Sequence, residues 1–312
     1  MENVAALILI DANQHLDLFR VTKGKKLLDP LREQQDYIFV TIQIVEEVQR
    51  RKLQVTASFL SKLFEQLKVR EFDVPDHLFD ISGETAAKLR EKLSDIDHRI
   101  KAINDDLIDA AVETLQRISR SEDEVSKALT VLFSKAVTPT PAEIQRARER
   151  KERGNPPGKK TDPLGDQLTW EQLLSHCKGK SKLWIISNDL DYCTKHGGKM
   201  FLNPLLYQDL ARMIQPTPEV FCFDSIDEGI RDFVQRTGVK AEMLPTPEES
   251  KEIKKELDSL PPLGWLSSAS GMDDANYVAI LNARSKQMSA PLWAAISNLG
   301  WHPGMKPDPD KP

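Results

Sequence analysis

The sequence has few cysteines, and this scarcity narrows what the protein can be. Of 312 residues only three are cysteine, at positions 177, 193 and 222, and no two of them have the C-x-x-C spacing. An odd number of widely separated thiols predicts neither a disulfide framework nor a zinc site. We therefore expect a reducing, cytoplasmic setting.

Long hydrophobic runs are also missing near the start of the chain. The one strongly apolar segment there covers residues 5–10, and no basic residues flank it. A signal-peptide core or a membrane span needs a longer run. We expect no membrane attachment and interpret the segment as a buried first strand.

The histidines show no pattern that is typical of a catalytic or metal-binding site. The six histidines are scattered, without the spacing of a metal site or a catalytic triad. We expect each to have a surface or hydrogen-bonded structural role: His15, His77, His98, His176, His196 and His302. Cys193 and His196 lie close in sequence, but no third partner is evident, which argues against a thiol nucleophile.

The net charge of −5 argues against a protein coated uniformly for nucleic-acid binding, but a net value hides local patches. Basic residues cluster in residues 50–52, 146–160 and 178–182. Two of these clusters lie beside acidic motifs, as expected where a phosphate backbone crosses a metal site. Ordinary solvated helix ends would explain any single cluster equally well.

Strand and helix patterns alternate along the chain. Continuous apolar runs predict strands at residues 4–10, 38–40, 183–186 and 220–223, and such runs are typical of strands covered on both faces. Helix starts are predicted by Thr41, by the capping-box patterns at Thr140, Ser225 and Thr246, and by Gly165-Asp166. Alternating strands and helices predict an α/β fold with a mostly parallel sheet. The last ten residues are expected to be disordered.

Residues 82–135 have a strongly helical composition. Apolar residues recur there every three or four positions, from Leu89 to Ala111, which predicts two or three long helices inserted between sheet elements. Their apolar stripes are typical of core or coiled packing, although a partner protein could also bind them.

Acidic residues stand at the ends of the predicted strands or at the starts of helices. In open parallel sheets, ligands bind at the carboxyl ends of the strands. Gathered carboxylates repel one another and need a cation, and a set without histidine or cysteine favours Mg²⁺ or Mn²⁺. The sequence thus predicts a metal site built from six acids: Asp11, Glu47, Asp162, Asp166, Asp189 and Asp191.

The order of these motifs resembles that of the PIN-domain nucleases. The resemblance rests on Asp11-Ala12-Asn13 after a strand, Thr41 with Glu47 on a helix, Asp166 at a helix start, and the segment 185–189. Residues 154–170, with Gln43, Glu47 and Arg50, resemble a bacterial PIN-like subgroup with a large helical insertion. It implies a PIN-like three-layer fold over residues 1–238, with the insertion at about 75–150 and a C-terminal extension over 239–312.

The resemblance also implies roles for individual residues. Asp11, Glu47, Asp166 and Asp189 would form the catalytic metal-binding quartet, with Asp162 and Asp191 as additional metal-binding acids. The substrate would contact a second set of residues: Asn13, Arg50, Arg153, Lys159, Lys160 and Ser187. The implied activity is a metal-dependent endoribonuclease acting on single-stranded RNA, as a toxin or defence effector with an inhibitory or activating protein partner. A homo-oligomer stays open.

Two other functions compete with this hypothesis. A haloacid-dehalogenase-like phosphohydrolase also uses an aspartate after its first strand, but it expects a second aspartate at the position of Asn13. A non-catalytic PIN-like scaffold would dock partners through its helical insertion. The acids could instead have purely structural roles, as helix caps, turn residues or solvated glutamates on a helix face. Glu46, adjacent to Glu47, leaves the helix assignment ambiguous by one position.

Overall fold

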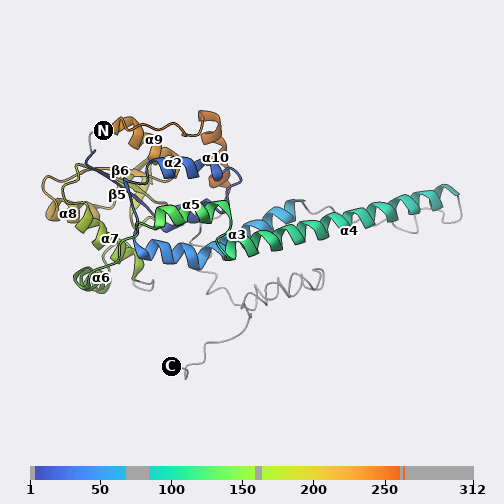
Figure 1. The fold of residues 1–312 in the computed structure, drawn as a ribbon, viewed down its shortest axis with the longest axis horizontal. Coiled ribbons are helices and arrows are strands. Elements are labelled where there is room, and N and C mark those ends of the chain that lie inside the picture. Colours follow the sequence, from blue (N-terminus) through green and yellow to red (C-terminus); the bar gives the residue numbers. More distant parts are fainter. Residues whose placement is uncertain (1–3, 68–83, 159–163, 261–262, 264–312) are drawn as a thin grey trace, which may run out of the picture. The chain divides into compact units, whose positions relative to one another are not determined.

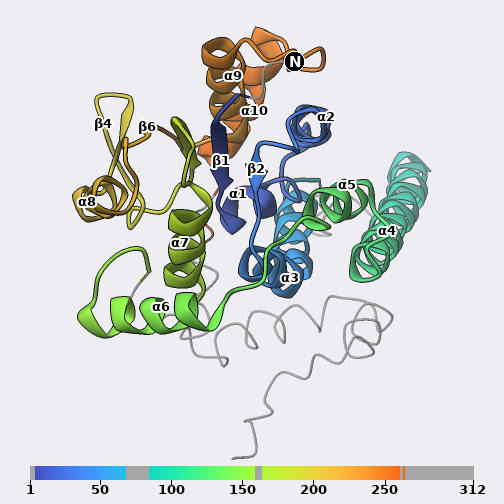
Figure 2. The same cartoon turned by 60° about the vertical axis from the view of Figure 1, so that its left-hand side comes forward.

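The computed structural model describes residues 4–67, 84–158, 164–260 and 263. Its centre is a four-stranded sheet in the order β2-β1-β3-β6, and every neighbouring pair is parallel. The strands are β1 (Ala6–Ile10), β2 (Ile38–Phe39), β3 (Lys182–Ile186) and β6 (Glu219–Phe223). Helices flank this sheet (Figures 1 and 2), so the predicted α/β class with a central parallel sheet is confirmed.

The apolar runs form these strands because the sheet is buried on both faces. Every residue of β1 is buried, and in β3 all residues after Lys182 are buried. Trp184 of β3 is fully buried, stacks on Phe221 at a centroid distance of 4.7 Å, and meets Phe233 edge-on at 5.0 Å. Strands covered on both sides need apolar residues at every position rather than at alternate ones.

The register of the strands decides where polar residues emerge. Ile10 pairs with Ile186, and Ile186 pairs with Phe223, so these three strands end at the same level. The next residue along each strand, Asp11 or Ser187 for β1 and β3, therefore lies at one common carboxyl edge.

The described residues also form ten helices: α1 (Ala12–Asp17), α2 (Lys25–Glu33), α3 (Ile42–Leu67), α4 (Glu84–Ser119), α5 (Glu124–Phe133), α6 (Pro141–Arg153), α7 (Gly165–His176), α8 (Pro204–Met213), α9 (Ile226–Thr237) and α10 (Pro247–Ser259). The predicted helix starts at Thr41, Thr140, Gly165, Ser225 and Thr246 each lie within a residue of an observed one. None of the helices found in the described residues is both long and apolar enough to cross a bilayer.

Three predicted capping boxes have different outcomes. Thr140 and Thr246 form complete boxes, in which Glu143 and Glu249 bond back to the cap residue. Ser225 accepts a hydrogen bond from the backbone N–H of Glu228, but the reciprocal bond is absent from this cap. The prediction was wrong in that half, because the Glu228 side chain pairs with Lys254 of α10 instead.

A two-stranded antiparallel hairpin was not anticipated. It consists of β4 (Cys193–His196) and β5 (Lys199–Leu202). Its two-residue turn is Gly197-Gly198, and both glycines have positive φ angles, +57° and +76°. Such turns match the twist of a hairpin and need residues without a Cβ. The Gly-Gly pair was a usable signal, but short strands rich in charge and polar groups obscured it.

The chain divides into two compact units. Met1–Val55 with Ser121–Pro261 form the first, and Thr56–Arg120 with Pro262–Pro312 form the second. The helices α5, α6 and α10 belong to the first unit. The insertion at about 75–150 and the C-terminal extension over 239–312 stay predictions. In the described residues of the second unit, α4 buries Ile100 and exposes Ile103 and other apolar residues of the predicted stripe. Residues 264–312 lie outside the described part of the chain.

Candidate active site

Four of the predicted acids come from four separate segments and meet near the carboxyl edge of the sheet. Asp11 follows β1, Asp189 lies three residues beyond β3, Glu47 lies on α3, and Asp166 is on the first turn of α7. Figure 2 shows the starts of α3 and α7 on either side of β1. One small cavity is lined by three of these acids together with Gln43, Thr169 and Tyr192. The convergence follows from the parallel register, since strands that end together present their following residues together.

Asp11 is held at the centre of this arrangement. Its backbone N–H donates to the Ile186 carbonyl at 3.0 Å, which continues the sheet by one residue. The Ser187 hydroxyl donates to Asp11 Oδ2 at 3.0 Å, and Ser187 Oγ in turn accepts from the backbone N–H of Asp189 at 3.0 Å. Asn13 Nδ2 approaches Asp11 Oδ2 at 3.4 Å. Ser187 thereby links two acids, and it is itself almost completely buried.

The acids act on one another electrostatically. Burial, followed by the charges of Glu47 and Asp189, raises the pKa of Asp11 from 3.8 to about 7, although the Ser187 hydrogen bond opposes this rise. A carboxyl group so placed is only partly ionised at neutral pH. A cation in contact with it would remove this penalty.

Tyr192 also lines the cavity and is close to the same acids. Its ring is buried and meets Trp170 edge-on at 6.3 Å. Burial raises the pKa of the Tyr192 phenol well above 10, and four nearby carboxylates raise it further: Asp166, Asp11, Asp189 and Glu47. The neutral hydroxyl group is therefore a cavity-lining donor among acids. Tyr192 was not predicted from the sequence, in which its one signal is its position three residues beyond Asp189.

The ambiguity between Glu46 and Glu47 is decided by the helix register. Glu47 lines the cavity, whereas Glu46 is exposed. Arg51, one turn further along α3, donates from Nη1 to Glu47 Oε1 at 2.8 Å and to Asn13 Oδ1 at 3.1 Å. Arg50, the predicted substrate contact, is exposed to solvent. A cation bonded to one of the acids was thus missed, although its spacing of four residues from Glu47 is typical of a helical ion pair.

The remaining predicted residues lie in different places. The backbone N–H of Asp191 donates to Asp189 Oδ1 at 2.9 Å, so Asp191 stays beside the site without lining its cavity. Arg153 lines a different cavity, between α6, α7 and α8. Three further predicted residues fall outside the described residues: Lys159, Lys160 and Asp162.

The donor set suits a hard cation. Every acid around the cavity offers carboxylate oxygens, which Mg²⁺ and Mn²⁺ prefer, and burial together with the charges of Glu47 and Asp189 raises the pKa of Asp11. Within residues 4–67, 84–158 and 164–260, no three Asp, Glu, His or Cys side chains already have the close arrangement of a metal site.

His15, one turn along α1 from Asp11, departs from expectation. It is completely buried, packs edge-on against Phe133 at 5.4 Å, and neither ring nitrogen has a hydrogen-bond partner among the described residues. The expected surface or hydrogen-bonded role was therefore wrong for His15. Burial lowers its pKa from 6.5 to about 3, so the imidazole is neutral at physiological pH.

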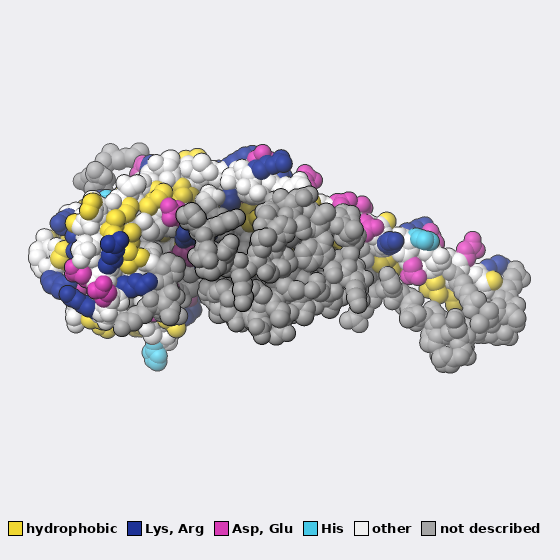
Figure 3. Space-filling view, turned by 90° about the horizontal axis from the view of Figure 1, so that it is seen from below, with side chains coloured by type: hydrophobic (Ala, Val, Ile, Leu, Met, Phe, Trp, Pro, Cys, Tyr) yellow, Lys and Arg dark blue, Asp and Glu magenta, His cyan; other side chains and the backbone are white. Residues whose placement is uncertain are grey.

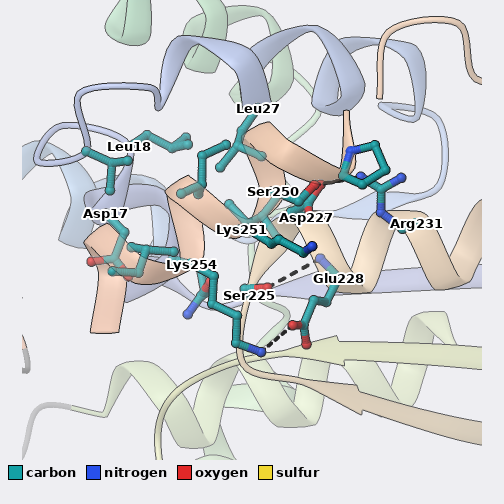
Figure 4. Close-up of a pocket in the computed structure, with 16 residues that line it drawn as sticks. Asp17, Leu18, Leu27, Ser225, Asp227, Glu228, Arg231, Ser250, Lys251 and Lys254 are labelled. Atoms are coloured by element: carbon teal, nitrogen blue, oxygen red, sulfur yellow. Dashed lines mark hydrogen bonds and ion pairs between the residues drawn. The ribbon is translucent and has the colours of Figure 1, made fainter. Parts of the chain in front are cut away.

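A larger cavity lies apart from the acids. It has a volume of about 300 Å³ and is formed by residues of α1, α2, α9 and α10 (Figure 4). Apolar side chains such as Leu18, Leu27 and Ile253 line it, and the Lys254–Glu228 ion pair lies beside them. None of the four convergent acids lines this cavity, so we do not assign the chemistry to it.

Comparison with known proteins agrees with the geometry. A family model described as a PIN like domain matches residues 7–205, which is more than half of the chain. The matched range contains β1 from its second residue, all of β3 and all four convergent acids. No curated protein matches the chain, and no solved structure does.

Proposed function

Because the chain belongs to the PIN-like domain family, we propose that it is a metal-dependent nuclease that hydrolyses phosphodiester bonds. The observation that carries the proposal is that Asp11, Glu47 and Asp166 line one cavity while the charge of Asp189 acts on Asp11. Burial and the charges of Glu47 and Asp189 raise the pKa of Asp11, and burial with the charges of all four acids raises the pKa of the Tyr192 phenol. Mutual repulsion of this kind destabilises a protein unless the site binds a cation.

Each acid has a defined part in this proposal. Asp11, Glu47, Asp166 and Asp189 would hold Mg²⁺ or Mn²⁺, with Asp191 and Asp162 as additional acids. When bound, such ions polarise the scissile phosphate and supply hydroxide from water. Ser187 orients Asp11 through its hydrogen bond, and Arg51 fixes Glu47 until the acids engage a cation. The four residues that converge are therefore our proposed catalytic residues.

We further propose single-stranded RNA as the substrate. Asn13 lies beside Asp11, and Arg50, Arg153, Lys159 and Lys160 would contact the phosphate backbone, which is attracted to cationic side chains. The resemblance to PIN-domain nucleases also supports a toxin or defence role with a regulatory protein partner. The cytoplasm is the expected location.

The test is cleavage of labelled single-stranded RNA and DNA by the purified full chain, with Mn²⁺, Mg²⁺ or EDTA. The test variant is Asp11→Asn Asp189→Asn. A matched control, Asp36→Asn Asp258→Asn, removes two exposed carboxylates from elsewhere on the surface. We expect metal-dependent cleavage by the wild type and the control, and none by the test variant. Absence of cleavage by the wild type on either nucleic acid would favour the scaffold hypothesis.

A further inference from the structure

A second polar cavity lies on the other side of α7 from the proposed catalytic acids. It has a volume of about 470 Å³ and is formed by residues of α6, α7, α8 and the loop after α6. This volume is typical of small-molecule sites. Four arginines line it, Arg146, Arg150, Arg153 and Arg212, beside three acids and the amides of Asn155 and Gln208. In Figure 3, Lys and Arg side chains lie beside acidic and hydrophobic ones over this part of the molecule. We call it the arginine cavity.

Arg150 forms the fixed wall of the arginine cavity. It is buried and donates from Nε to Glu171 Oε1 at 2.9 Å, from Nη2 to Asp209 Oδ2 at 2.5 Å, and from Nη1 to the Pro156 carbonyl at 2.8 Å. Trp170 Nε1 also donates to Asp209 Oδ2, at 3.3 Å. One guanidinium group thus joins α6, α7, α8 and the loop after α6.

The other arginines of the cavity donate only some of their N–H groups to other residues of the protein. Arg146 Nε donates to Glu171 Oε2 at 2.9 Å, and Arg212 Nη2 donates to Asp209 Oδ1 at 2.9 Å. Their side chains remain 40% and 74% exposed, so the guanidinium groups keep free donors. Arg153 is exposed and makes no ion pair with a described residue. Because every carboxylate oxygen of Glu171 and Asp209 already accepts a guanidinium hydrogen bond, the remaining donors favour an external anion.

The loop after α6 connects the arginine cavity to the catalytic acids. Asn155 lines the cavity, and a Cβ added to Gly158 would lie 3.2 Å from the Asp166 Cβ atom. Three residues span at most about 11 Å, so the cavity wall and Asp166 are within reach of one bound strand. Gly158 has a φ of +81° and would also meet the Gln167 side chain at 2.5 Å, which restricts this position to glycine.

We propose that the arginine cavity is a phosphate subsite, which binds the backbone of a single-stranded nucleic acid beside the scissile bond. The inference rests on the proposed function, and it deepens it by adding Arg212 and Arg146 to Arg153 as backbone contacts. Forked guanidinium groups suit phosphate oxygens because they can donate two hydrogen bonds at once.

The experiment measures binding of single-stranded RNA and DNA oligonucleotides in EDTA, over a range of salt concentrations. The test variant is Arg153→Ala Arg212→Ala, which leaves the buried Arg150 in place. The control Arg32→Ala Lys127→Ala removes the same charge from the exposed surfaces of α2 and α5. We expect affinity to fall about tenfold in the test variant. The slope of log affinity against log salt should fall by about 1.4 if two phosphate contacts are lost.

Several results would overturn the proposal. Equal affinity and salt slope in wild type and test variant would contradict it, as would equal losses in the control variant. A polyglutamate peptide that binds as tightly, with the same dependence on Arg153 and Arg212, would show a site for acidic protein segments. Failure of the nuclease hypothesis looks different: the oligonucleotide would still bind through the arginines, but no metal would produce cleavage.

Discussion

Carboxylates occur in two settings on opposite sides of α7, and the contrast indicates what each set does. In the arginine cavity, Glu171 and Asp209 are bound by guanidinium groups, with Arg150 between them. At the carboxyl edge of the sheet, Asp11 faces other acids, and Arg51 pairs with Glu47. The first set has its counter-charge inside the protein and holds helices together. In the second set, burial and the charges of Glu47 and Asp189 raise the pKa of Asp11, and such perturbed carboxyl groups are a feature of binding sites.

The largest expected effect comes from breaking the structural network. Arg150→Ala removes the counter-charge between two buried carboxylates, and such losses cost about 3–5 kcal/mol. We expect the low end of this range, because Arg146 and Arg212 keep their bonds. Urea unfolding of the full chain measures the change in unfolding free energy. Arg212→Ala, at an exposed position, is the matched control and should cost less than about 1 kcal/mol. Equal losses would contradict the division into buried and exposed partners.

A substitution at the catalytic acids should stabilise the metal-free protein, whereas Arg150→Ala destabilises it. Asp11→Asn removes a buried, repelled carboxyl group while keeping its shape, so the metal-free protein should unfold at a higher temperature at pH 8. In the same variant, Mn²⁺ should no longer raise the unfolding temperature, because stabilisation by a ligand requires binding to the native state. Thermal unfolding with and without Mn²⁺ measures both. Destabilisation of the metal-free variant would show that Asp11 is structural, like Glu171.

The pH dependence sharpens the comparison. The pKa of Asp11 is raised to about 7 in the folded protein, so its contribution to stability is complete below about pH 4 and is lost as pH rises towards 7. A bound cation must displace this proton. Mn²⁺ affinity should therefore increase with pH, by up to about tenfold per unit, and level off above about pH 7. Calorimetric titration across pH 5.5–8.5 checks this, and a flat profile would contradict the raised pKa.

His15 should have a smaller effect on stability than Asp11, and its contribution should change with pH in the opposite direction. Its pKa is lowered to about 3, so its contribution to stability is complete above about pH 6.5 and is lost as pH falls towards 3. Between about pH 4 and 6.5 the slopes from His15 and Asp11 therefore oppose each other. His15→Leu removes two unsatisfied buried nitrogens and should stabilise the protein by about 1–3 kcal/mol.

Unfolding curves at several pH values separate the two groups. The His15→Leu variant should lose stability as pH rises from 4 to 7, and Asp11→Asn should gain it. His196→Leu, at an exposed histidine of β4, is the control and should leave the pH profile unchanged. Identical profiles in all three variants would show that neither buried group titrates as described.

Much of the fold could be predicted from local sequence. The apolar runs of β1 and β3 and the capping boxes at Thr140 and Thr246 specify strands and helix starts through nearest neighbours alone. The family and the α/β class followed from their order, and both are confirmed. The β4–β5 hairpin was missed because its pairing depends on a two-residue glycine turn rather than on hydrophobic periodicity.

The sequence by itself determined that acids follow buried strands, because Asp11 and Asp189 come shortly after apolar runs that form strands wherever both faces are covered. Only the tertiary structure decided which neighbours each acid meets. It placed Glu47 rather than Glu46 on the cavity, brought Arg51 and Tyr192 to the acids, and left Arg50 in solvent. The physical reason is that helix rotation and strand register set side-chain distances, and electrostatic interactions depend on those distances rather than on sequence separation.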